Sequence, residues 1–105
     1  MKYNLADLAA VVRSKNSGPY EITFDIIFKE EEMFRRVAGA GIINREGFAA
    51  LYHIKPQDVL SVVEFPPAKA IKVTIARPIP SGSLGETDVY GAQQHGPLLA
   101  FSFDM

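Results

Sequence analysis

The chain has 105 residues, of which 48% are apolar, and this is the length and composition of one folded domain rather than two. Its 11 lysines and arginines nearly balance 12 aspartates and glutamates, which argues against a protein that mainly coats nucleic acid or an anionic membrane. The absence of cysteine excludes disulfides, thiolate metal sites and cysteine nucleophiles. Because there is neither a membrane-length apolar run nor a signal-peptide pattern, we expect one cytoplasmic domain over residues 1–105, with no membrane and no nucleic-acid partner.

The first half of the chain predicts helices with one strand among them. Asn4 is a suitable N-cap for a helix whose apolar stripe begins at Leu5. Gly18 and Pro19, at the end of the polar segment 13–19, mark where that helix must have stopped. Asn44 can cap a later helix in the same way. Helices are expected over 5–12, 29–38 and 45–53, and an alternating apolar pattern predicts a strand over 20–28.

The second half predicts strands separated by turn-forming residues. Two prolines, Pro66 and Pro67, interrupt an apolar stretch and indicate a hairpin that lacks a tight two-residue turn. Glycine followed by Pro97 is a helix stop signal. Strands are expected over 59–65, 68–77 and 98–104, a loop over 78–88 and a short helix over 88–95.

After the first helix, the expected order of elements is β-α-β-β-α-β, which is the ferredoxin-like pattern of the α+β class with an extra N-terminal helix. Each expected strand has one strongly apolar face, so we expect the helices to cover one face of the sheet. The other face would carry Thr23, Asp25, Lys72 and Thr74. Such a face is either wet or covered by another subunit or domain.

The 13–19 segment is the first candidate binding site. Its side chains Arg13, Ser14, Lys15 and Asn16 are of the kinds that hold a carboxylate or a phosphate. The alternative interpretation is a solvated helix end, where cations lie favourably against the helix dipole.

The long loop and short helix over 80–95 form the second candidate. Glycines there allow close approach of a ligand to the backbone, and an ordered loop of this length is commonly functional. The alternative is a connection held by its own side-chain caps. The candidate substrate-binding residues of this segment are Ser81, Ser83, Thr87, Asp88, Tyr90, Gln93 and Gln94.

Two residues are candidates for acid–base catalysis. Asp25 lies in the middle of a strand on its polar face, where it could act as a base or could simply pair with Lys72 across the sheet. His95 lies near a helix end, where a histidine is more often a cap or a packing residue. No spacing of ligands supports a metal site, and no motif indicates a cofactor.

Several of these motifs together resemble an uncharacterised bacterial family of short proteins. They are RSKNSGP at 13–19, TFDI at 23–26, PPA at 66–68 and PSGSLGETDVYGAQQH at 80–95. The family is catalogued as a domain of unknown function, and its members are typically encoded beside acyclic terpene utilisation proteins of the AtuA type. The leucine-rich start and the RSKNSG motif are also similar to the ferredoxin-like C-terminal domain of AtuA-type proteins, although Lys15 and Asn16 replace an Asp-Lys pair there.

The resemblance implies a small accessory subunit of an AtuA-type catabolic enzyme that acts on a carboxylic acid or an acyl thioester. Arg13 and Lys15 would hold the anionic part of the substrate, and the 80–95 loop would close the site. Two alternatives stay open: a self-contained homo-oligomeric enzyme with sites between chains, and a non-catalytic interaction module. The expected partners are therefore an AtuA-type protein or further copies of the chain, with a small anionic ligand.

Overall fold

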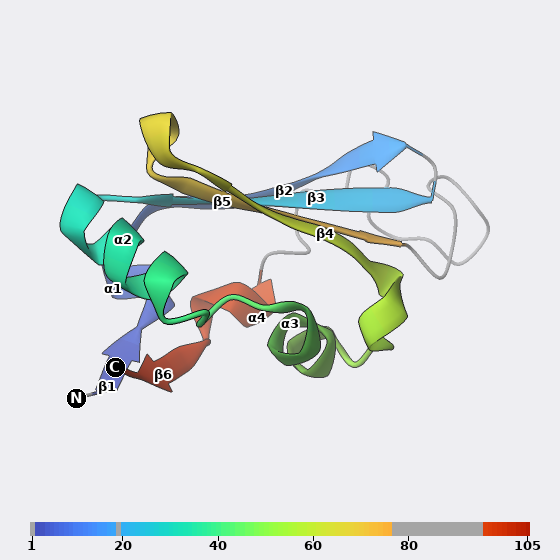
Figure 1. The fold of residues 1–105 in the computed structure, drawn as a ribbon. Coiled ribbons are helices and arrows are strands. Elements are labelled where there is room, and N and C mark those ends of the chain that lie inside the picture. Colours follow the sequence, from blue (N-terminus) through green and yellow to red (C-terminus); the bar gives the residue numbers. More distant parts are fainter. Residues whose placement is uncertain (1, 19, 77–95) are drawn as a thin grey trace.

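The computed structural model describes residues 2–18, 20–76 and 96–105. Its helices are short, and its strands supply most of the regular structure (Figure 1). The strands are β1 (Lys2–Asn4), β2 (Ala9–Gly18), β3 (Glu21–Phe28), β4 (Val59–Phe65), β5 (Ala70–Ala76) and β6 (Ser102–Asp104). The helices are α1 (Leu5–Leu8), α2 (Glu31–Gly39), α3 (Arg45–Tyr52) and α4 (Gly96–Leu99), with single 3-10 turns at Pro56–Asp58 and Pro66–Ala68.

The main sheet has four strands in the order β2-β3-β5-β4, and every neighbouring pair is antiparallel. β3 and β4 therefore run parallel to each other with β5 between them, which is a split β-α-β arrangement whose crossover contains α2 and α3. All four helices lie on one side of this sheet, as the sequence predicted for a helix-covered face (Figure 1). β1 and β6 pair with each other in a separate two-stranded sheet.

Local signals place α2 and α3 close to their predicted positions. The side chain of Asn44 accepts a 2.7 Å hydrogen bond from the Gly47 backbone, so it caps α3 as expected. His53 ends that helix in the left-handed conformation, with φ of 56°. α2 begins two residues later than predicted, with acidic residues in its first turn and Arg36 in its last, as the helix dipole favours.

The predicted helix over 5–12 is confirmed only for Leu5–Leu8, and the predicted loop over 13–19 is wrong for its described residues. α1 ends after one turn at Leu8, and the Asn4 side chain makes no capping hydrogen bond. Residues 9–18 form β2, because pairing with β3 along nearly its whole length satisfies the backbone groups that a loop would leave to water. The adjacent β-branched residues Val11 and Val12 suit a strand better than a helix.

The predicted strand over 98–104 is also largely wrong. Residues 96–99 are the helix α4, and only Ser102–Asp104 is extended, paired with β1 outside the main sheet. The place beside β3 that the last strand of a ferredoxin-like domain would take is occupied by β2. The chain is therefore a mixed α+β domain with antiparallel sheets, and the ferredoxin-like order is not confirmed. The predicted helix over 88–95 lies outside the described residues.

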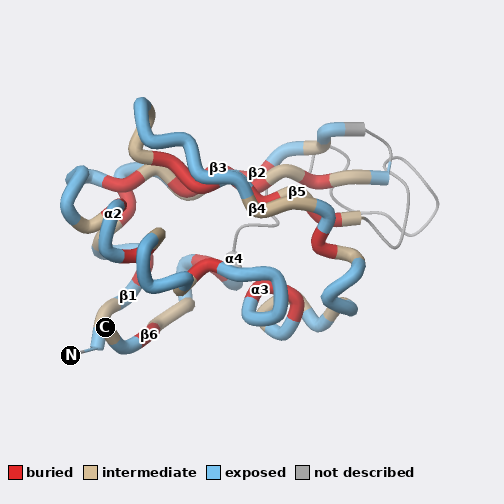
Figure 2. The backbone as a smooth tube through the Cα atoms, viewed as in Figure 1, coloured by how far each residue is buried: buried red, intermediate tan, exposed pale blue. Residues whose placement is uncertain are grey.

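The core lies between the main sheet and the helices, where the buried residues of both layers face each other (Figure 2). Phe24 is fully buried, and its ring lies 5.1 Å from that of Phe48 and 4.9 Å from that of Tyr52. Leu98 of α4 and Leu5 of α1 are also fully buried and contribute to the same cluster. Burial of this apolar area is the main force that holds the helices against one face of the sheet.

Candidate functional site

The main sheet face that points away from the helices is the candidate site, and we call it the open face. Because side chains alternate along a strand, the strand register sorts most of its residues into three rows across β2, β3, β5 and β4, and Glu21 and Ala76 follow beyond the polar row. The polar row is Lys15, Thr23, Thr74 and Ser61. The charged row is Arg13, Asp25, Lys72 and Val63. The apolar row is Val11, Ile27, Ala70 and Phe65.

Asp25 is the centre of the charged row and the most unusual residue of the open face. It is 3% exposed, although it belongs to the face that no described helix covers. Its Oδ2 accepts a hydrogen bond from Arg13 Nε at 3.0 Å, and its Oδ1 lies 3.9 Å from Lys72 Nζ. Oδ1 is buried and accepts no hydrogen bond from the part of the chain that the structure describes. A buried charge is tolerated when it is paired, so the two cations on neighbouring strands are what allow this carboxylate to lie there.

The two cations keep binding capacity of their own. The side chains of Arg13 and Lys72 are 60% and 52% exposed. Arg13 bonds Asp25 through Nε alone, which leaves the N–H groups of its two terminal nitrogens for other acceptors. Asp25 thus fixes the position of a guanidinium whose remaining donors face no acceptor in the described part of the chain.

The polar and apolar rows flank this charged row. The hydroxyls of Thr23 and Thr74 lie 3.3 Å apart and share a hydrogen bond between β3 and β5. In the apolar row, Val11 and Phe65 lie at the two edges of the sheet and are 39% and 50% exposed, whereas Ala70 between them is buried. Val63 of the charged row, which is close to Phe65 on β4, is also 50% exposed. The open face therefore changes from polar to charged to apolar along the strands, with rows about 7 Å apart.

The structure brings together part of the predicted site. Arg13, Lys15, Asp25 and Lys72 share the open face, and the predicted pairing of Asp25 with Lys72 across the sheet is confirmed. The predicted anion-binding loop is wrong in its conformation, since its residues form β2. Ser14 and Asn16 fall at the alternate positions of β2, which face the helix side, and Ser14 is buried at 6% exposure.

The remaining candidates lie outside the described residues. These are Ser81, Ser83, Thr87, Asp88, Tyr90, Gln93, Gln94 and His95. Conversely, sequence reasoning missed the exposed apolar residues Val11, Val63 and Phe65. The two-residue spacing of Val63 and Phe65 in the predicted strand 59–65 could have placed both on one face, whereas Val11 depended on recognising β2 as a strand.

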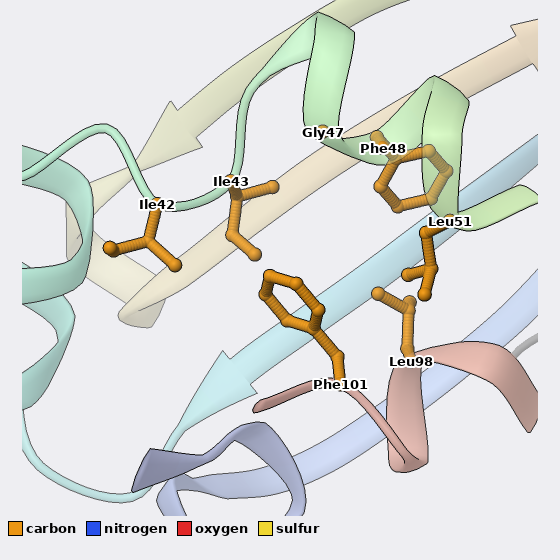
Figure 3. A pocket seen from close by; sticks show the side chains of 7 residues that line it. All are labelled: Ile42, Ile43, Gly47, Phe48, Leu51, Leu98 and Phe101. Carbon is orange, nitrogen blue, oxygen red and sulfur yellow. The ribbon is translucent and has the colours of Figure 1, made fainter. Parts of the chain in front are cut away.

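An apolar pocket lies on the other side of the sheet, between α3 and α4 (Figure 3). Its walls include Ile43, Phe48, Leu98 and Phe101, and its interior of about 10 Å³ has room for at most one water molecule. We interpret it as a packing gap. A more open groove of about 430 Å³ runs between α2 and β4, where Glu31 and Arg35 form an exposed ion pair at 2.8 Å.

The described residues offer little other reactive chemistry. Burial raises the pKa of the Tyr52 phenol well above its usual value, and a hydrogen bond with the Leu98 backbone offsets part of that rise. No cluster of three metal-ligating side chains occurs within residues 2–18, 20–76 and 96–105. None of the described helices is both long and apolar enough to cross a membrane.

Comparison with known families agrees with the extent of this domain. A family model described as a domain of unknown function, DUF4387, matches residues 5–102. The chain belongs to this family. Neither the curated proteins nor the solved structures contain a match. Membership of a family of unknown function was expected from the motifs, whereas the link to AtuA-type proteins stays a prediction.

Proposed function

We propose that this chain is a non-catalytic accessory subunit that works in an assembly, with the open face as its assembly surface. The observation that carries the proposal is the pair of exposed apolar side chains on β4, Val63 and Phe65, beside the paired charges. Phe65 and Val63 are each half exposed on a face that no described helix covers. Apolar groups gathered in this way beside polar ones are typical of an interaction surface.

The arrangement of Asp25 favours a binding role over a catalytic one. A general base must reach a substrate proton, but Asp25 is 3% exposed and lies behind Arg13 and Lys72. Its contacts are those of a residue that positions two cations. This favours the accessory subunit over a self-contained enzyme in which Asp25 is the acid–base group.

The resemblance noted in the sequence gives the proposal its context. An AtuA-type enzyme acting on a carboxylic acid or an acyl thioester is the assembly we propose, with Arg13 and Lys72 available to an anionic group. The exposed fractions of these two side chains, 60% and 52%, support this availability.

The test compares two apolar residues of nearly equal exposure on opposite sides of the molecule. Phe65 is 50% exposed on the open face, and Leu99 is 47% exposed on α4. The wild type, Phe65→Asp and Leu99→Asp are passed through size exclusion with mass detection, alone and after co-expression with an AtuA-type protein. We expect Phe65→Asp to abolish assembly and Leu99→Asp to leave it intact.

Folding of each variant is checked by its thermal melt, and Phe65→Ser serves as a milder variant if the aspartate lowers the melting temperature. Equal behaviour of the Phe65 and Leu99 variants, or no assembly of the wild type in either setting, would refute the proposal.

A further inference from the structure

We propose that the open face binds the open face of a second copy of this chain, in a two-fold symmetric dimer. The inference rests on the proposed role of the open face as an assembly surface, and it names the occupant. It follows from the symmetry of the three rows, from the unsatisfied oxygen of Asp25 and from the distribution of charge.

The rows of the open face are complementary to themselves. The midline of the sheet lies between β3 and β5, because the strand order is β2-β3-β5-β4. A two-fold axis along this midline superimposes each row on the same row of the other copy in reverse order. Val11 then faces Phe65 of the partner subunit, and Thr23 faces Thr74 of the partner subunit. Apolar groups meet apolar groups, and hydroxyls meet hydroxyls.

The central pair of the charged row is complementary under the same operation, whereas Arg13 at the edge of the row faces the partner's Val63. Asp25 faces the partner's Lys72, and Lys72 faces the partner's Asp25, so opposite charges meet twice at the centre. Asp25 Oδ1 is buried without a hydrogen bond from the described residues, and its own Lys72 is 3.9 Å away. A buried carboxylate oxygen without a donor costs free energy, and further positive charge nearby lowers that cost. The partner's Lys72 brings a second positive charge toward this carboxylate across the interface and offsets part of that cost, while the side chains of its own copy cover Oδ1.

Other occupants fit this face less well. Its cations are Arg13, Lys15 and Lys72, which lie on the same face as the carboxylates of Asp25 and Glu21. Three cations are fewer than the 4–8 of a typical site for anionic lipid. The pockets described in the molecule lie against α2, α3 and α4 rather than on this face, whereas small ligands prefer concave sites. An acidic protein surface would satisfy the cations, and it is the outcome that the experiment below separates from a second copy.

The size of the face indicates a weak dimer. Four strands spaced about 4.8 Å apart and three rows spaced about 7 Å apart span an area of roughly 400 Å² on each copy. The two faces together amount to about 800 Å², which is below the range of standard-size interfaces, so we expect a transient dimer with a dissociation constant in the micromolar range or above.

The first measurement is sedimentation equilibrium of the pure chain from about 1 μM to 1 mM, a range that brackets this affinity. We expect the mass to rise from 11.5 kDa toward twice that value with increasing concentration. A monomer at every concentration would overturn the inference. It would leave the proposed function standing if Phe65→Asp still abolished binding to an AtuA-type protein.

The second measurement tests the register of the dimer. Lys15 and Ser61 lie on opposite edge strands, about 14 Å apart within one chain, but the two-fold axis places each against the other in the partner subunit. We expect Ser61→Glu to tighten the dimer roughly twofold to tenfold, because the new ion pair forms twice, and Ser61→Lys to weaken it by a similar factor.

The double variant Lys15→Glu with Ser61→Lys places the carboxylate at position 15 and the ammonium group at position 61. We expect this variant to dimerise as tightly as Ser61→Glu, because the same ion pair forms with its two charges exchanged. A dimer that is indifferent to all three variants and to Phe65→Asp uses another surface, and this result would overturn the inference.

Discussion

The Arg13–Asp25–Lys72 row leads to an unusual expectation: removing an exposed cation should destabilise the fold more than removing the buried anion. Arg13→Met keeps the apolar stem but leaves a carboxylate that is 4% exposed, with Lys72 at 3.9 Å as its nearest cation. A buried charge that loses its hydrogen-bonded partner costs about 2–3 kcal/mol. Asp25→Asn instead leaves two cations that water already reaches, and we expect a cost of about 1 kcal/mol.

Urea unfolding of dilute monomer, followed by far-UV circular dichroism, measures both free energies of unfolding. A difference of about 1 kcal/mol also separates the melting temperatures by roughly 4–8 °C in a domain of this size. Arg35→Met is the matched control, since it removes one partner of an ion pair that is exposed on both sides and should cost no more than about 0.5 kcal/mol. If Asp25→Asn proved equal to or worse than Arg13→Met, our interpretation of the row would be wrong.

Three further expectations concern the helices and the core. Asn44→Ala should lower the free energy of unfolding by about 1 kcal/mol because it removes a 2.7 Å cap, whereas Asn4→Ala should change it little, and urea titrations compare the two. Gly41→Ala should destabilise by about 1 kcal/mol because φ is +65° there, while Gly39→Ala in α2 should be neutral or stabilising in the same assay. The unfolded chain ionises Tyr52 at high pH before the folded chain does, so stability should fall above about pH 10; Tyr52→Phe should reduce that fall in melts taken between pH 8 and 11.

Local sequence patterns were sufficient to predict a helix or strand where a single signal, such as an alternating apolar pattern or a cap, dominated. The alternation of Ile22, Phe24 and Ile26 predicted β3, and the cap at Asn44 predicted α3 to within one residue. Strand β4 was predicted over its observed range, 59–65. In these segments, short-range preferences and tertiary packing favour the same conformation.

The N-terminal segment was mispredicted because its apolar spacing fits a helix as well as a strand. Leu5, Leu8 and Val12 share a helical face, and nothing local shows that β3 has an unpaired edge for residues 9–18 to join. Pairing with β3 overrides a weak helical preference. The same mistake hid part of the site, since Arg13 and Lys15 were placed in a loop instead of on a strand beside Asp25.

The charged row itself was only half predictable. The pairing of Asp25 with Lys72 followed from assigning both residues to polar faces of neighbouring strands. The contact with Arg13 depends on a strand that sequence patterns did not reveal, and so does the burial of Asp25 to 3% exposure. The topology, rather than the residue types, turns these three side chains into one feature.

The most direct test that the open face is where this chain assembles is isotope-filtered NMR on a mixture of labelled and unlabelled copies. We expect contacts between the Phe65 ring of one copy and the Val11 methyl groups of the other, because the two-fold axis along the sheet brings these half-exposed side chains together. Contacts between copies that involve Leu99 and the helix-covered side instead would contradict it.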